Sequence, residues 1–198
     1  MGILAITLVF GMTITACDNG GGGGDDNGGN NSGGGGKQPF TSISDMRNWL
    51  AAQPENTAET AYTVMLNVST LRGGYASDGS SETYGNAGNA LNLNKTKYVN
   101  LDLSGSTITS IERKAFMECT SLTGITIPSS VTGIGSVAFW RCTNLTSVTF
   151  QGTIASNDFS YNRSFYGDLR KKYLATGGGI GTYTTTAPVS ERSVWTKQ

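Results

Sequence analysis

Few side chains in this sequence could take part in covalent or metal chemistry. The chain contains three cysteines, Cys17, Cys119 and Cys142, and no histidine. Serine and cysteine nucleophiles usually need an imidazole base, and the common hydrolytic zinc sites need histidine ligands. We therefore predict that the protein is not an enzyme and that it binds no metal ion and no cofactor.

Two further patterns would support chemistry of other kinds. A glycoside hydrolase needs two carboxyl groups at a defined separation, and Asp158 and Asp168 are the candidates, although nothing in the sequence brings them together. The glycine-rich run 177–182 lacks the lysine of a P-loop, and Thr182 stands where a dinucleotide-binding loop would have glycine. We expect this run to form a turn rather than a phosphate site.

The charge balance argues against nucleic-acid binding. The chain has 14 basic and 14 acidic residues, and residues 1–36 carry only three aspartates, which leaves the other residues with a formal charge of +3. Proteins that neutralise many phosphates carry a larger basic excess. The basic run 170–172 fits a solvated helix face, with contact to acidic lipid or glycan as the alternative.

The first residues are typical of an export signal. Residues 2–16 form an apolar run that is too short for a membrane-spanning helix. The tetrapeptide 14–17, which ends in Cys17, resembles the bacterial lipobox, although no lysine or arginine precedes the apolar run. The resemblance implies that residues 1–16 are removed and that lipidated Cys17 anchors the protein to a membrane, with the cell surface as its location. A simple signal peptide or a buried N-terminal strand is the alternative.

Residues 17–39 follow as a segment rich in glycine, asparagine and aspartate. No apolar residue occurs from Asp18 to Gly36. Such a segment cannot repay the entropy of its own ordering. We therefore expect a disordered tether between the anchor and the rest of the chain.

Residues 98–154 contain an internal repeat. Residues 109–131 align with residues 132–154 at a spacing of 23 residues, and a partial copy precedes them. Each copy has an alternating segment whose apolar side chains face one side of a strand, and stacked copies would build a continuous apolar ladder. The matched pairs are Ile111 with Ile134, Ala115 with Ala138, Phe116 with Phe139, Cys119 with Cys142, Leu122 with Leu145, Ile125 with Val148, and Ile127 with Phe150.

This spacing resembles the BspA-type leucine-rich repeat, a class found in surface proteins of spirochaetes and other host-associated anaerobes. The resemblance is specific over residues 98–150. It implies an α/β solenoid of two full repeats and one partial repeat, in which the segment around Ala115 and Phe116 forms a turn or helical return. It also implies adhesion to a host or bacterial surface protein, with a structural surface-coat lipoprotein as the alternative.

Residues 40–97 are expected to cap the N-terminal end of the repeats. Met46, Trp49 and Leu50 recur at helical spacing after Ser44, and residues 62–68 alternate as a half-buried strand does. Residues 72–86 are rich in glycine and serine, and we expect a surface loop there, followed by a short helix at 87–94.

Residues 155–198 are expected to cap the C-terminal end. Residues 168–174 have helical character, and the glycines at 177–179 end the helix. We predict a final strand around Tyr183, with Trp195 covering the last coil.

Cys119 and Cys142 occupy equivalent positions in consecutive repeats. Stacking aims both side chains into the core, so we expect buried free thiols. A disulfide is the alternative, since equivalent positions on adjacent coils lie close together.

The best candidates for an interaction surface are aromatic residues beside an arginine. Trp140 follows an inward-facing phenylalanine and precedes Arg141, and Tyr161, Phe165 and Tyr166 lie in a polar stretch after the last repeat. Aromatic and arginine side chains are the usual anchors of protein interfaces. The alternative is that these aromatic residues pack inside the C-terminal cap.

Overall fold

The structure of the protein is a computed structural model that describes residues 39–74 and 86–198. These residues belong to one unit, Gly33–Gln198. The expected signal segment 1–16, the tether up to residue 38, and residues 75–85 of the expected loop lie outside the described residues. The interpretation of these segments therefore rests on the sequence.

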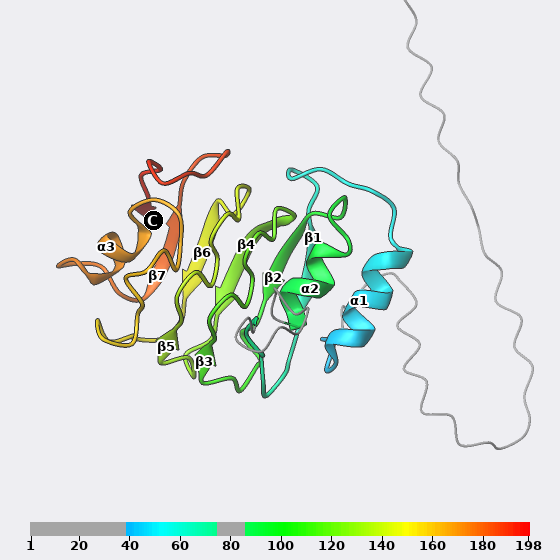
Figure 1. Ribbon diagram of the computed structural model, residues 1–198, viewed down its shortest axis with the longest axis horizontal. Helices are drawn as coiled ribbons and strands as arrows, with labels where there is room; N and C mark the ends of the chain where they lie inside the picture. The colour runs from blue at the N-terminus through cyan, green and yellow to red at the C-terminus, as the bar shows by residue number, and fades with distance from the viewer. Residues whose placement is uncertain (1–38, 75–85) are drawn as a thin grey trace, which may run out of the picture. The chain divides into compact units, whose positions relative to one another are not determined.

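A six-stranded sheet forms one wall of the unit (Figure 1). The first four strands in the sheet order run parallel, and the last two are antiparallel to their neighbours. In this order the strands are β1 (Tyr62–Met65), β2 (Val99–Asp102), β4 (Leu122–Ile127), β6 (Ser147–Phe150), β7 (Gly181–Thr184) and β8 (Thr196–Lys197).

The register of the parallel strands stacks equivalent residues on one another. Val64 of β1 is opposite Leu101 of β2, which is opposite Ile125 of β4, which is opposite Val148 of β6. All four side chains are buried. The alternation expected for residues 62–68 and for the repeats is therefore confirmed, because a strand places every second side chain on the core face.

A second line of parallel pairing joins β3 (Ser110–Ile111) to β5 (Gly133–Ile134) at another side of the coil. Beyond these strands the chain returns through turns rather than through a helix. In the return of one coil, Phe116 N–H donates to Ala138 O of the next coil at 2.8 Å, and Glu118 N–H donates to Trp140 O at 2.7 Å. These N–H groups are thus unavailable for the bonds within one segment that make a helix.

Positive backbone φ angles recur in these returns. Lys114 and Glu118 have φ of 59° and 60°, and the equivalent residues Val137 and Arg141 have φ of 51° and 60°. The left-handed conformation is costly for residues other than glycine, above all for a β-branched residue such as Val137. The repetition of the same conformation in both coils shows that the stacking of the coils imposes it.

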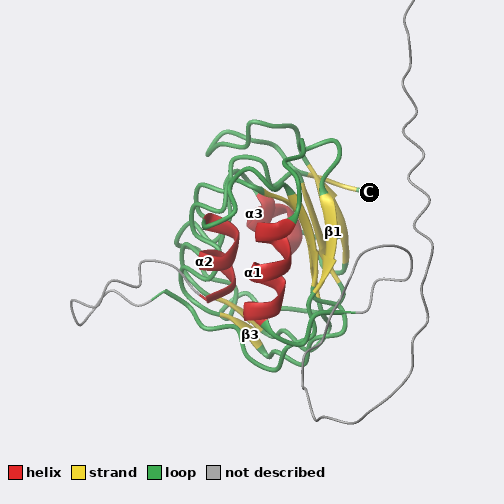
Figure 2. Cartoon of the chain, turned by 90° about the vertical axis from the view of Figure 1, so that its right-hand side faces the viewer, coloured by secondary structure: helices red, strands yellow, loops and turns green. Residues whose placement is uncertain are grey.

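Helices close the N-terminal end of the coil, where α1 (Ile43–Ala52) and α2 (Asn86–Asn92) lie between the sheet and the returns (Figure 2). Helix α1 begins one residue before Ser44, because the Ser42 hydroxyl accepts a hydrogen bond from Asp45 N–H at 3.3 Å and acts as the N-cap. The helix expected at 87–94 is confirmed as α2.

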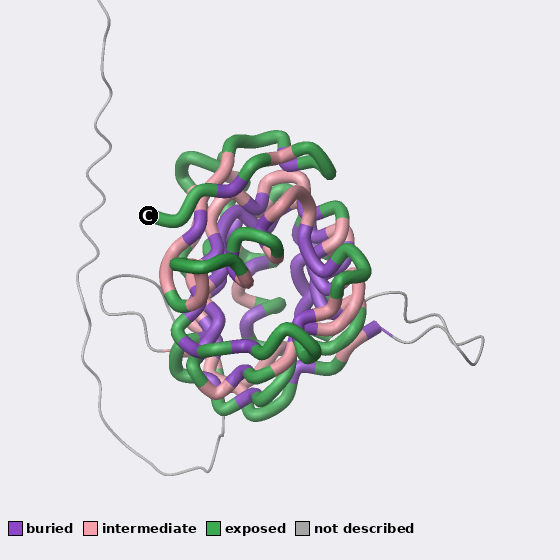
Figure 3. Tube along the Cα trace, turned by 90° about the vertical axis from the view of Figure 1, so that its left-hand side faces the viewer, coloured by how far each residue is buried: buried purple, intermediate pink, exposed green. Residues whose placement is uncertain are grey.

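At the other end, α3 (Leu169–Leu174) is followed by the antiparallel pair β7 and β8. The helix and the strand around Tyr183 are thus confirmed, and Trp195 is buried as expected. Seen from this end, buried residues line the inside of the ring formed by the chain (Figure 3). In the part of the chain that the structure describes, no helix has the length and apolar character needed to cross a membrane.

Candidate interaction surfaces

The glycine-rich run after α3 is the C-terminal cap of that helix. Gly178 N–H donates to Ala175 O at 2.8 Å, and Gly179 N–H donates to Tyr173 O at 2.7 Å. The ammonium group of Lys197 donates to Gly177 O at 3.2 Å and to Gly178 O at 2.9 Å. Carbonyl oxygens that hold a cation have the wrong polarity for a phosphate, so the expectation of a turn is confirmed.

The carboxylate of Asp168 has a structural role. Its Oδ1 accepts a hydrogen bond from Trp195 N–H at 2.8 Å, and its Oδ2 lies 3.9 Å from Lys172 Nζ. These contacts attach α3 to the last segment of the chain. Among the described residues there is also no group of three or more cysteine and carboxylate side chains that could hold a metal ion.

Cys119 and Cys142 are buried free thiols in the ladder, as expected. Cys142 Sγ donates a hydrogen bond to Phe116 O at 2.9 Å, and Cys119 Sγ lies 3.5 Å from Gly88 O. Burial raises the pKa of Cys142 from 9.0 to about 12 and raises that of Cys119 well above its ordinary value. Reactive cysteines are exposed and have a lowered pKa, so these two are components of the core.

Trp140 and Arg141 form the centre of a polar and aromatic surface on the return side of the coil. The guanidinium carbon of Arg141 lies 4.1 Å from the centre of the Trp140 ring, and Arg141 Nη1 donates to Glu118 Oε1 at 3.0 Å. The hydrogen bond with Glu118, assisted by one with Tyr166, raises the pKa of Arg141. We name Glu118, Trp140, Arg141 and Tyr166 the return-side patch.

The next coil places the other predicted residues beside this patch. Phe139 N–H donates to Ser164 O at 2.8 Å, which aligns residues 161–166 with the return that carries Trp140. Tyr161 is 87% exposed and Tyr166 is half-buried. Phe165 is only 6% exposed and stacks on Phe139, so the prediction that Phe165 belongs to the surface is wrong, and the alternative of packing in the cap holds for it.

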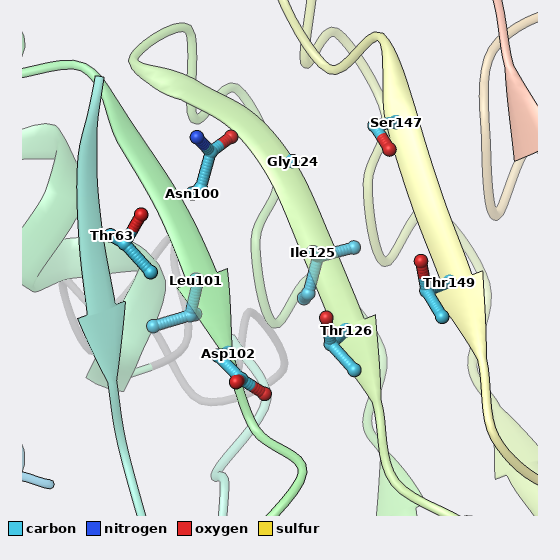
Figure 4. Close-up of a pocket in the computed structure, with 9 residues that line it drawn as sticks. All are labelled: Thr63, Asn100, Leu101, Asp102, Gly124, Ile125, Thr126, Ser147 and Thr149. Carbon is cyan, nitrogen blue, oxygen red and sulfur yellow. The ribbon is translucent and has the colours of Figure 1, made fainter. Parts of the chain in front are cut away.

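The outer face of the sheet carries a groove that the sequence did not reveal (Figure 4). It has a volume of about 380 Å³ and crosses β1, β2, β4 and β6. We call it the sheet groove. Its lining residues are Thr63, Asn100, Leu101, Asp102, Gly124, Ile125, Thr126, Ser147 and Thr149.

A missing side chain in the middle of one row forms the deepest part of this groove. Gly124 of β4 is opposite Asn100 of β2 on one side and Ser147 of β6 on the other. Glycine therefore leaves a notch between two polar side chains (Figure 4). A second row joins Asp102, Thr126 and Thr149 in the same way. The outward positions could have been listed from the strand alternation, but their types follow no repeat, so no sequence signal singles them out.

The stacked parallel strands, the turns that return the chain and the continuous apolar ladder define the fold as a leucine-rich repeat solenoid. Residues 90–168 match the family model of the BspA type leucine-rich repeat region, in six copies. These residues therefore form a BspA-type leucine-rich repeat region, and the protein is a leucine-rich repeat protein of this type. The expected number of two full repeats and one partial repeat stays a prediction. Comparison with curated proteins and with solved structures finds no match.

Proposed function

We propose that this protein is an exported surface lipoprotein whose repeat domain adheres to proteins of a host or of another bacterium. A BspA-type leucine-rich repeat region supports a protein-interaction domain. The observation that carries the proposal is the return-side patch, in which an arginine lies over an exposed tryptophan face. Tryptophan, tyrosine and arginine are the residue types that contribute most to protein interfaces.

The geometry of the patch favours binding, because its arginine is already held in place. The side chain of Arg141 is 54% exposed although it contacts both Trp140 and Glu118. A partner therefore meets a guanidinium group that has lost part of its conformational freedom, which lowers the entropic cost of association. The exposed ring of Tyr161 adds an aromatic side chain on the adjacent coil.

Anchoring is supported by the sequence alone. Residues 1–16 have the character of a signal, Cys17 ends a lipobox-like tetrapeptide, and residues 17–39 have the composition of a tether. Two acyl chains hold a protein at a membrane far more stably than one chain does. A diacylated Cys17 would therefore retain the repeat domain at a surface.

Intact-mass analysis tests the anchor. The full chain is expressed in a bacterial host, and its mass is compared with that of the Cys17→Ser variant. We expect a mature species that begins at Cys17 and carries acyl chains, and we expect this species to be absent from the variant. An unmodified product from the unsubstituted chain would overturn the lipoprotein assignment and leave the repeat fold intact.

Binding to immobilised host matrix proteins and to bacterial surface proteins tests the adhesion. Arg141→Glu inverts the charge at the centre of the patch, and Arg47→Glu makes the same change at an exposed position on α1. We expect binding to be lost in the Arg141 variant and retained in the Arg47 variant. Equal binding by both would exclude the patch, and the absence of binding to any of these proteins would favour the structural coat role.

A further inference from the structure

The sheet groove offers a chemistry that differs from that of the return-side patch. We propose that it is a second binding site, and that it takes a neutral saccharide that lies over Gly124 and is hydrogen-bonded by Asn100 and Asp102. The proposal is independent of the lipid anchor and of the protein-binding patch, because none of the residues that form the groove belongs to either.

The groove is lined by short polar side chains. It contains threonine, serine, asparagine and aspartate, and its lining includes neither an arginine or lysine nor an aromatic side chain. Asp102 is the single charged group in the lining, so an anionic ligand would be repelled. The hydroxyl, amide and carboxylate groups together provide both donors and acceptors, as the hydroxyl groups of a sugar require.

Asn100 and Asp102 are each fixed at one end of the side chain. One end of the Asn100 amide lies 2.8 Å from Thr123 Oγ1, and Asp102 Oδ1 accepts a hydrogen bond from Ser104 N–H at 2.8 Å. In Figure 4 both side chains project from the outer face of β2, two residues apart. The second end of each group is thus held in place toward the groove, and a ligand that bonds to it orders little of the protein.

Gly124 provides the space for the ligand. A Cβ atom built on Gly124 would lie 2.7 Å from Asn100 Oδ1 and 3.7 Å from the Cβ of Ser147. Any side chain at this position would therefore fill the notch and displace the Asn100 amide. The neighbouring coils carry Asn100 and Ser147 at the equivalent positions, so the notch interrupts an otherwise continuous row.

A peptide fits this groove poorly. Strand β4, which forms its floor, is paired with β2 on one side and with β6 on the other, so it has no free edge to which a peptide strand could be added. The lining also lacks the aromatic and arginine anchors of a protein interface. The observations therefore favour a saccharide over a protein segment.

The test uses the full chain with Cys17→Ser, applied to an array of neutral oligosaccharides, with affinities of retained sugars measured by calorimetry. Gly124→Ala and Asn100→Ala are the variants, and Arg141→Glu is the control outside the groove. We expect retention of a neutral sugar, a loss of affinity of about tenfold in each groove variant, and unchanged affinity in the control. Binding is expected to be insensitive to salt, since the ligand carries no charge.

Gly124→Ala displaces only the movable end of a side chain, and Asn100 is exposed, so both variants are expected to fold, which circular dichroism checks. Failure to retain any neutral sugar would overturn the proposal, as would equal retention by both groove variants. Loss of protein binding in Gly124→Ala, without sugar binding by the unsubstituted chain, would replace the saccharide by a protein segment. Loss of protein binding in Arg141→Glu alone bears on the return-side patch and not on the groove.

Discussion

The ring of Phe165 stacks on the ring of Phe139, with centroids 4.4 Å apart and planes 13° from parallel. Phe139 stacks in turn on Phe116, with centroids 5.2 Å apart. Phe116 and Phe139 are equivalent residues of the 23-residue repeat, whereas Phe165 follows Phe139 by 26 residues. The coil after the repeats therefore continues their aromatic stack with a different spacing, and this continuation joins the cap to the array.

Replacing Phe165 with alanine is expected to lower the free energy of unfolding by about 3–5 kcal/mol. The substitution removes a buried ring and leaves a cavity between Phe139 and Phe159, which both contact it. Chemical denaturation followed by circular dichroism measures the loss. Tyr161→Ala is the control, because its ring is 87% exposed and its removal should change stability by less than about 0.5 kcal/mol. Equal effects of the two substitutions would contradict the stacking role.

Tyr173→Phe is expected to destabilise the protein by about 1–3 kcal/mol. The Tyr173 hydroxyl accepts a hydrogen bond from Ile154 N–H at 2.8 Å and donates one to Gly152 O at 3.0 Å. These bonds attach α3 to the end of the last repeat, and their loss leaves two backbone groups without partners. Tyr62→Phe is the matched control, because its hydroxyl donates one exposed bond to Pro54 O. Denaturation curves that shift equally for both variants would refute this assignment.

The part of the fold that repeats was predictable from the sequence, because equivalent residues reveal which positions face the core. Ile125 and Val148 are 23 residues apart in the chain and directly opposite each other in the sheet. The position of Phe165 was not predictable in this way. Its altered spacing removes the alignment, and a phenylalanine in a polar stretch has the same local appearance whether it is exposed or stacked.

The returns and the groove depend on contacts between coils, which local sequence does not encode. The choice of turns over a helix follows from bonds such as Phe116 N–H to Ala138 O, which join residues 22 positions apart. The groove arises because Gly124 lies between Asn100 and Ser147 once the strands are in register. The return-side patch was partly predictable, since Trp140 and Arg141 adjoin in the chain, but the contribution of Glu118 required the stacking of two coils.

Arg141→Ala is expected to change the free energy of unfolding by about 1 kcal/mol or less. Its ion pair with Glu118 is well exposed, and exposed ion pairs and exposed cation–π contacts contribute little to stability. Protein binding, in contrast, should weaken at least about tenfold, because arginine in an interface centre contributes more than about 1.4 kcal/mol. Denaturation and binding are measured on the same preparation. A loss of stability as large as the loss of binding would indicate that Arg141 acts through the fold rather than through contact with a partner.

Stability is expected to fall at alkaline pH because of the buried thiols. Burial raises the pKa of Cys142 from 9.0 to about 12, so the folded protein holds this proton more tightly than the unfolded chain does. The contribution to stability is therefore complete below about pH 9 and is lost as the pH rises toward 12, at up to about 1.4 kcal/mol per pH unit. Burial raises the pKa of Cys119, Tyr173 and Tyr183 as well, and these groups act in the same direction. Cys142→Ala should remove its own share of the slope and leave theirs. Unfolding free energies measured under reducing conditions on both sides of pH 9 decide the matter, and parallel pH profiles for the two proteins would show that Cys142 does not titrate on unfolding.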